Sequence, residues 1–540
     1  MSDQNSSAQR VRAELALLFL VIVYALSIDL KGIWGDEGYR YFLITGGRTW
    51  QQYSRGGAGS FADVIRAVGP TSYQPLFYLV DNAVLRLAQT PSDILLRLVN
   101  VFWFWLGARG VLRFFRDYSE RTRLFGLAVF ALNGFVLLNV MQIREYPMFL
   151  ALMFWTSILC FEILEMPAEA PWGNWWPRLA GYGALAALLF YTHVFSLFAL
   201  AAQAVVFLAR KQDRRRFLRR LMLSYGVLAA LVLPWVFLIS TRYAAKLDPG
   251  VWDRRTPGIK LLIATLMEGC RFLFTYGLWS GYPQLQAAVL LFAVGVPCSW
   301  IAAKKMGERI DRRAVYAVLT IVFFGLFQVA YFFKQVFATW PRYFFAYYFG
   351  YTVLATCAFA VLDRVSRRKN TPEWKLASLA VFFLVCLSGL SQLSLYRSDP
   401  YLDTDMNAKD NRRTVSRAML QYARPADTIV YPNSRLAWAI EITIPYYANE
   451  LFYEDILNAG PPKVAGLWVL DTSGPPEMLK RVFARLDSSG YRSTKAFELG
   501  YNCRLVWFET GEQGPKVSES VRGGVPARGI SSRPRQATGP

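Results

Sequence analysis

Reactive and nucleotide-binding motifs are scarce in this chain of 540 residues. It has one histidine and six cysteines, with no C-x-x-C pair and no zinc-like spacing. Neither a disulfide framework nor a cysteine metal cluster is therefore indicated, and the cysteines fit best as small apolar residues. The glycine-rich segment 55–60 lacks the G-K-S/T of a phosphate-binding loop, and no G-x-G-x-x-G follows a strand-like run. The chain thus shows no visible means of holding ATP or a nucleotide sugar.

Acidic residues are few compared with basic ones: 38 Asp and Glu against 60 Lys and Arg, a net charge of +22. On a soluble protein this excess would suggest nucleic acid as a partner. Here 54% of the residues are hydrophobic, and runs of about 17–25 apolar residues recur, each long enough to cross a hydrocarbon layer of ~30 Å. We therefore predict an α-helical polytopic membrane protein that contacts lipid and binds no nucleic acid.

About eleven transmembrane helices are predicted from these apolar runs. Arginine and lysine are concentrated after the second, sixth, eighth and tenth runs. These ends share a side with the N-terminus, so the positive-inside rule makes that side the cytoplasm. The first run resembles a signal sequence, and we expect it to be retained as an anchor. The predicted spans are 13–29, 95–112, 124–141, 147–164, 179–192, 194–209, 221–240, 286–302, 314–333, 343–362 and 376–394.

The opposite, outer side collects the polar residues that lie at helix ends. Two amphipathic stretches, 74–90 and 258–279, are expected to lie on the outer surface as juxtamembrane helices. Charge is costly in lipid, so polar groups gathered at helix ends usually mark a site. The outer groups are loop 30–93 with Asp36 and Glu37, and the segments 142–147, 191–193 and 334–343.

The chain changes character after the last span. The strand-like runs DTIVYP, VAGLWVLD and CRLVWFE alternate with helix-like runs, which predicts a small α/β domain. No aromatic residue follows Phe508, so the end of the chain is expected to be disordered. The predicted organisation is a transmembrane domain over 1–396, an outer α/β domain over 397–510 and a disordered tail over 511–540.

Two adjacent carboxylates, Asp36 and Glu37, follow the first span. A carboxylate can act as a general base toward a hydroxyl, an assistance worth about 10²–10⁴ in rate. The alternative is that both acids only begin a helix over 37–46, because acidic residues are favoured at the positive end of a helix.

Three cations, Arg144, Lys334 and Arg342, each lie at an outer helix end beside tyrosine or tryptophan. Arginine presents a fork of donors that matches phosphate. Any one of them could instead reach ordinary lipid headgroups. Three such cations on one face favour a site for a phosphate.

His193 is the only histidine, and it ends a span on the outer side. With Asp36 and Glu37 it could complete a divalent metal site, contact a phosphate or relay a proton, whereas the plain alternative is a packed histidine. The remaining outer acids, Asp81 and Glu145, are expected to be solvated or salt-bridged.

Five short motifs resemble those of the GT-C superfamily of membrane glycosyltransferases, in its bacterial protein-mannosyltransferase-like and aminoarabinose-transferase-like branch. The likeness covers about 13–400, and the order and spacing of the motifs matter more than any one of them. This chain departs from the pattern at Gln74-Pro75, where many relatives show two prolines. The motifs are Trp34-Gly35-Asp36-Glu37-Gly38-Tyr39, Gln74-Pro75-Leu76-Phe77-Tyr78 with Leu96-Arg97-Leu98, Arg144-Glu145-Tyr146, Tyr191-Thr192-His193 and Pro341-Arg342-Tyr343.

The resemblance implies a sugar donor linked to polyprenyl phosphate. It implies that Asp36, next to Glu37, is the base that activates the acceptor hydroxyl, with inversion at the sugar carbon C1. The departing lipid phosphate would be stabilised by the basic motifs and their tyrosines, which are Arg144, Tyr146, Lys334, Arg342 and Tyr343.

The expected protein is thus a glycosyltransferase of the bacterial inner membrane, with a periplasmic active site and a cytoplasmic N-terminus. Its acceptor would be a hydroxyl of an envelope glycan, a glycolipid or a protein. One alternative is a ligase or polymerase that uses lipid-pyrophosphate glycans. Another is a transporter or flippase without chemistry, although charged residues at mid-depth and internal repeats, which such proteins show, are not evident.

Overall fold

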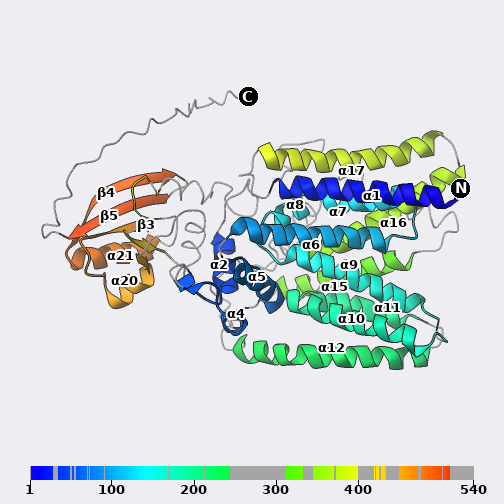
Figure 1. Ribbon diagram of the computed structural model, residues 1–540, viewed down its shortest axis with the longest axis horizontal. Coiled ribbons are helices and arrows are strands. Elements are labelled where there is room, and N and C mark those ends of the chain that lie inside the picture. The colour runs from blue at the N-terminus through cyan, green and yellow to red at the C-terminus, as the bar shows by residue number, and fades with distance from the viewer. Residues whose placement is uncertain are drawn as a thin grey trace.

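A bundle of long helices and a smaller mixed α/β unit make up the computed structural model (Figure 1). The α/β unit lies beyond the end of the bundle that carries α2, α4 and α5 (Figure 1). The structure describes residues 2–27, 35–48, 52–53, 56–69, 71, 73–89, 92–167, 169–210, 214–243, 311–332, 345–369, 372–398, 419, 421–424, 427–432, 449–471, 476–500 and 503–510.

The long helices of the bundle coincide with most of the predicted spans. Among the described residues, four segments are long and apolar enough to cross a membrane: Asp93–Phe114, Tyr146–Glu165, Phe217–Phe237 and Tyr347–Arg368. The helices are α1 (Ser2–Ala25), α6 (Asp93–Phe114), α7 (Glu120–Ala131), α8 (Gly134–Val140), α9 (Tyr146–Glu165), α10 (Trp172–Thr192), α11 (Ser196–Leu208), α12 (Arg214–Tyr243), α15 (Arg312–Phe332), α16 (Phe345–Lys369) and α17 (Pro372–Ser398).

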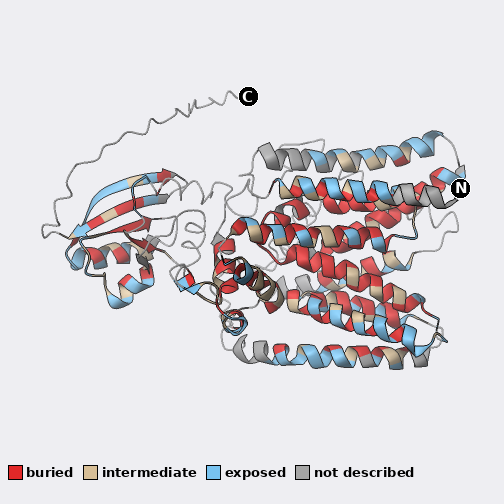
Figure 2. Cartoon of the chain, in the orientation of Figure 1, coloured by how far each residue is buried: buried red, intermediate tan, exposed pale blue. Residues whose placement is uncertain are grey.

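Helix α9 forms the centre of the bundle, and α12 and α17 lie at its margins (Figure 2). Nearly every side chain of α9 is buried, whereas α12 and α17 expose large apolar residues such as Phe237 and Phe383. Aqueous solvent would make such surfaces costly, so exposed apolar rims fit a lipid surrounding.

The predicted span 124–141 is instead two helices. Helix α7 ends at Ala131 and α8 begins at Gly134. Asn133 between them is buried, and its carbonyl accepts the Leu137 N–H at 3.0 Å. Asparagine and glycine at the break explain the interruption, because both are poor residues for a helix interior. The predicted span 286–302 and the amphipathic stretch 258–279 lie outside the described residues.

A hydrogen-bonded cluster ties five helices together inside the bundle. The Tyr182 hydroxyl donates to Gln203 Oε1 at 2.9 Å, and Gln203 Nε2 donates to the Tyr316 hydroxyl at 3.0 Å. Tyr182 also bonds the Tyr225 hydroxyl at 2.8 Å, and Tyr316 bonds the Ser157 hydroxyl at 3.0 Å. These residues belong to α10, α11, α15, α12 and α9, so the cluster sets the relative position of those helices.

Short helices close one end of the bundle: α2 (Gly35–Ile44), α4 (Phe61–Val68) and α5 (Pro75–Ala88). Ser60 and Asp63 form a capping box that starts α4. Gly59 lets α4 approach α2, because a Cβ there would lie 2.9 Å from the Thr45 carbonyl oxygen. Helix α5 falls within the stretch predicted as amphipathic, and it directs Asp81 and Asn82 inward.

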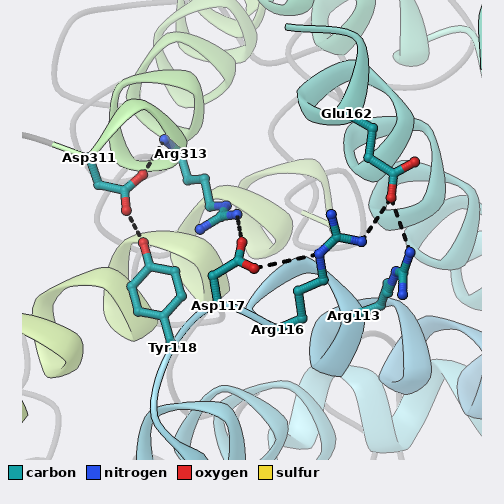
Figure 3. A network of polar contacts seen from close by, with 7 residues as sticks. All are labelled: Arg113, Arg116, Asp117, Tyr118, Glu162, Asp311 and Arg313. Carbon is teal, nitrogen blue, oxygen red and sulfur yellow. Dashed lines mark hydrogen bonds and ion pairs between the residues drawn. The ribbon is translucent and has the colours of Figure 1, made fainter. Parts of the chain in front are cut away.

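The opposite end of the bundle carries a network of ion pairs (Figure 3). Arg113 and Arg116 both contact Glu162 of α9, at 3.1 and 3.0 Å. Arg313 at the start of α15 donates to Asp117 at 2.9 Å, and the Tyr118 hydroxyl donates to Asp311. The basic residues predicted to follow the second span therefore join α6 to α9, while Asp117 and Tyr118 beside them contact the start of α15.

The described strands of the α/β unit form a mixed five-stranded sheet in the order β2-β1-β3-β5-β4. Strands β1, β2 and β3 are parallel, and β5 is antiparallel to β3 and β4. The three strand-like runs of the sequence coincide with β1, β3 and β5. The elements are β1 (Thr428–Tyr431), β2 (Asn449–Phe452), α20 (Tyr453–Ala459), β3 (Gly466–Asp471), α21 (Pro476–Ser488), β4 (Tyr491–Gly500) and β5 (Cys503–Thr510).

Candidate functional site

Helix α2 carries the predicted acidic pair at its first turn. Asp36 is the second residue of α2, and its side chain is outside the described part of the chain. Glu37 follows it and is completely buried. The position of Asp36 therefore depends on what holds this turn of the helix.

Glu37 anchors α2 to two other elements. Its Oε1 lies 3.4 Å from Arg97 Nη2 on α6 and accepts the Ile143 N–H at 2.9 Å. Arg97 also lies 3.9 Å from Asp93, one turn earlier on α6. Arg97 is itself fully buried, so the acids compensate a charge that lipid or protein would otherwise exclude.

A second buried ion pair lies one helical turn further along α2. Arg40 contacts both carboxylate oxygens of Glu145, through Nε at 3.2 Å and through Nη2 at 3.2 and 3.1 Å. Its guanidinium also lies 5.4 Å from the centre of the Tyr73 ring. Burial lowers the pKa of Arg40, but the combined charge interactions with Glu145 and the neighbouring tyrosines hold that pKa well above its usual value. The pair is therefore fully ionised at neutral pH.

Two side chains hold the loop between α8 and α9. Asn100 on α6 donates to the Gln142 carbonyl, and Glu37 on α2 accepts the N–H of the next residue, Ile143. Arg144 in the same loop is buried, and its guanidinium lies 5.7 Å from the Tyr146 ring centre. The loop therefore holds Arg144 against the same end of the bundle as α2.

His193 caps the C-terminal end of α10 beside this loop. Its Nδ1 accepts the Phe195 N–H at 3.2 Å, and its ring centre lies 6.3 Å from that of Tyr146. Burial lowers the pKa of His193 to about 4, and Arg40 acts in the same direction while Glu145 opposes it. The imidazole is therefore neutral at pH 7 and carries its proton on Nε2.

A small, partly open pocket lies between α5, the Glu145 loop and the end of α10. Its lining residues are Tyr73, Gln74, Tyr78, Glu145, Thr192, His193 and Val194.

Of the two further outer acids, Glu145 is salt-bridged as expected, but Asp81 is buried from solvent and has no ion-pair partner among the described residues. Asp81 is completely buried, and nothing among the described residues donates a hydrogen bond to either of its oxygens. Burial, assisted by the charge of Glu145, raises its pKa well above the usual range. Its position on the inner face of α5 thus favours the protonated, neutral form of this acid.

The fold brings Glu37, Arg144, Tyr146 and His193 to one end of the bundle. Lys334, Arg342 and Tyr343 lie outside the described residues. Within the described ranges, no three side chains of His, Cys, Asp or Glu gather as a metal would require. The Glu37 carboxylate is already engaged by Arg97 and by the Ile143 N–H.

Several buried residues of this site have no role that the sequence alone assigned to them. Arg40, Arg97 and Gln74 are all buried here, although arginine and glutamine are ordinarily exposed. Besides its place in the Leu96-Arg97-Leu98 motif, Arg97 is a charge within an apolar run, which usually marks a site. Nothing in the sequence indicates that Arg40 and Glu145, far apart in the chain, form a pair.

Solved structures identify the fold. ArnT from Cupriavidus metallidurans in the apo state is 13% identical, with a TM-score of 0.56, over 93% of this chain and 98% of that one. The same protein bound to undecaprenyl phosphate gives a TM-score of 0.55 over the same shares at 13% identity. This likeness confirms the predicted GT-C fold.

The other comparisons add little. An oligosaccharyltransferase from Archaeoglobus fulgidus is 14% identical over 80% of this chain and 62% of that one, but its TM-score of 0.44 is too low to carry an argument. No protein-family model matches the chain, and no curated protein matches it by sequence.

Proposed function

We propose that this protein is an inner-membrane glycosyltransferase, which moves a sugar from a polyprenyl-phosphate donor to a hydroxyl acceptor at the periplasmic face. The observation that carries the proposal is the site at the end of the bundle, where two buried ion pairs fix the turn of α2 that begins with Asp36 beside the Arg144 loop. The fold shared with a structure bound to undecaprenyl phosphate supports a lipid-phosphate donor.

The proposed reaction is a single displacement. Asp36 takes the proton of the acceptor hydroxyl while that oxygen attacks C1 of the sugar and the bond from C1 to the phosphate oxygen breaks. The phosphate leaves with the lipid and gains negative charge, which Arg144, Lys334 and Arg342 would stabilise, with Tyr146 and Tyr343 beside them. Attack opposite to the leaving group inverts C1.

Glu37 has a different role from Asp36 in this mechanism. Its carboxylate is buried, faces Arg97 and accepts a backbone N–H of the Arg144 loop. The Glu37 carboxylate is therefore already occupied by contacts within the protein. We assign Glu37 the task of holding α2 against the loop, and we leave proton transfer to Asp36.

The proposed membrane arrangement has about eleven spans, with a cytoplasmic N-terminus and a periplasmic α/β domain over 397–510. The positively charged links and the polar site lie at opposite ends of the bundle, which supports this orientation. The transmembrane domain over 1–396 would contain all residues of the reaction.

The test is turnover of defined donors by the purified full-length protein. We expect sugar transfer from polyprenyl-monophosphate sugars to envelope glycan, glycolipid or protein acceptors, and none from polyprenyl-diphosphate glycans. Turnover of only the diphosphates would identify a ligase or polymerase. If neither donor reacts but labelled lipid crosses a vesicle membrane, the protein is a transporter.

A further inference from the structure

The pocket beside Glu145 contains buried polar atoms for which the described part of the chain offers no hydrogen-bond partner. These are the Gln74 side-chain oxygen and the Tyr78 hydroxyl. Gln74 precedes α5 at its N-cap position, but its side chain makes no capping hydrogen bond. A buried polar atom without a partner is costly, so this arrangement is one that a ligand can relieve.

The hydrogen-bonding character of the pocket limits what that ligand can be. The Gln74 side-chain oxygen and the Glu145 carboxylate only accept hydrogen bonds. The neutral imidazole of His193 donates through Nε2, because Nδ1 accepts the Phe195 N–H. An ionised phosphate has only acceptor oxygens, so it cannot donate to the Gln74 oxygen and would face the negative charge of Glu145. Sugar hydroxyls both donate and accept, so they can bond both the Gln74 oxygen and the Tyr78 hydroxyl.

Charge and shape point to the same ligand. Arg40 compensates the charge of Glu145 through two donors, so the acidic wall of the pocket is internally neutralised. Tyr73 and Tyr78 supply aromatic surface, with ring centres 5.8 Å apart. An uncharged ring with hydroxyls on its edge and C–H groups on its face matches such a lining.

We propose that this pocket is the subsite for the transferred sugar, that the sugar is an uncharged polyhydroxylated ring, and that Gln74 and Tyr78 recognise its hydroxyls. The inference rests on the proposed function. It places the lipid phosphate outside the pocket, toward the basic motifs, and it makes Gln74 and Tyr78 specificity-determining residues.

Binding of matched lipids to the full-length protein in nanodiscs tests this assignment. The probes are farnesyl phosphate and the same lipid carrying glucose, mannose, arabinose or glucuronic acid. The variants are Gln74→Leu and Tyr78→Phe, and Tyr422→Phe on the α/β unit is the matched control. Thermal unfolding first shows that each variant is folded, and Tyr78→Phe keeps the ring, so it preserves the pocket's shape.

We expect the parent protein and the control to bind at least one neutral glycolipid more tightly than bare farnesyl phosphate. Each pocket variant should bind the neutral glycolipid about five- to tenfold more weakly than the parent does, as expected for the loss of one hydrogen bond. Both variants should bind the bare lipid as the parent does, and the glucuronic acid lipid should show no gain.

Other results overturn the inference in distinguishable ways. If the variants keep the full gain, or if the charged sugar binds as well as the neutral ones, Gln74 and Tyr78 do not recognise a neutral ring, and the proposed function stands. If the variants lose bare farnesyl phosphate, the pocket holds the phosphate instead. If the parent binds neither bare nor glycosylated lipid, the proposed function fails and the inference falls with it.

Discussion

Arg97 on α6 lies 3.4 Å from Glu37 on α2, and both side chains are completely buried. This contact joins the second long helix of the bundle to the turn that carries Asp36. It also places Glu37 where it can accept the Ile143 N–H, so three elements meet at one ion pair. Its loss should affect both the stability of the protein and the geometry of the site.

Replacing Arg97 with Met should destabilise the protein by about 3–5 kcal/mol, because Glu37 and Asp93 would be left as uncompensated buried acids. The double variant Glu37→Gln with Arg97→Met should recover much of that loss. Thermal unfolding in detergent measures both. The control is Arg109→Met, whose pair with Glu14 is about half exposed and worth only about 0–1 kcal/mol. Equal losses for Arg97→Met and Arg109→Met would contradict the anchoring role.

Replacing Asp36 with Asn should abolish sugar transfer while donor binding and unfolding temperature stay near those of the parent. Loss of a general base costs about 10²–10⁴ in rate. Initial rates and lipid binding, measured on the same preparation, separate chemistry from affinity. A fully active Asp36→Asn protein would remove this residue from the mechanism.

Replacing Arg342 with Ala should weaken donor binding, slow transfer or do both, because the leaving phosphate would lose a charge-assisted contact. Steady-state kinetics with varied donor report both effects. Arg368→Ala, at the end of α16 that carries the predicted cytoplasmic charges, is the control. Unchanged donor affinity and rate in Arg342→Ala would rule out phosphate binding by this residue.

His193 should make the folded protein less stable as the pH falls. Its pKa is lowered from 6.5 to about 4 on folding, so between these values the unfolded chain takes up a proton that the folded chain excludes. Stability from this group is complete above about pH 6.5 and is lost progressively toward pH 4, by up to about 3 kcal/mol. Unfolding temperatures of the parent and His193→Gln across this range should converge, and parallel curves would count against the burial of an uncharged imidazole.

Replacing Gln203 with Leu should destabilise the bundle by about 1–2 kcal/mol, because the buried hydroxyls of Tyr182 and Tyr316 would lose their shared partner. Thermal unfolding gives the loss. Replacement of the exposed Leu208 by Ala on the same helix is the control, and we expect it to have little effect. If Gln203→Leu is as stable as the parent, the cluster does not position the helices.

The sequence predicted the helical bundle closely because membrane helices require long apolar runs, which composition displays directly. Spans such as 147–164 match their helices within a few residues. The span 124–141 was wrong because two residues, Asn133 and Gly134, break a run whose hydropathy is continuous. The separate strands β2 and β4 were missed because neither carries the apolar run that marked β1, β3 and β5.

The candidate site was only partly predictable. Outer residues such as Arg144 and His193 could be grouped by topology, since helix ends on one side of a membrane must emerge together. The engagement of Glu37 by Arg97 could not be read from Asp36-Glu37, because it depends on how α2 packs against α6. The partners of Arg40 and Glu37 lie 105 and 60 positions away in the chain.

By itself the sequence determined that this chain is a polytopic helical protein with polar motifs at one face, because hydropathy and charge act locally along the chain. Only the tertiary structure decided that Glu37 and Glu145 are bound to arginines, that Asp81 is buried with no hydrogen-bond partner among the described residues, and that Gln74 and Tyr78 line a pocket. Those outcomes depend on which helices pack together, and burial in that packing sets whether a charge is paired, neutralised or left for a substrate.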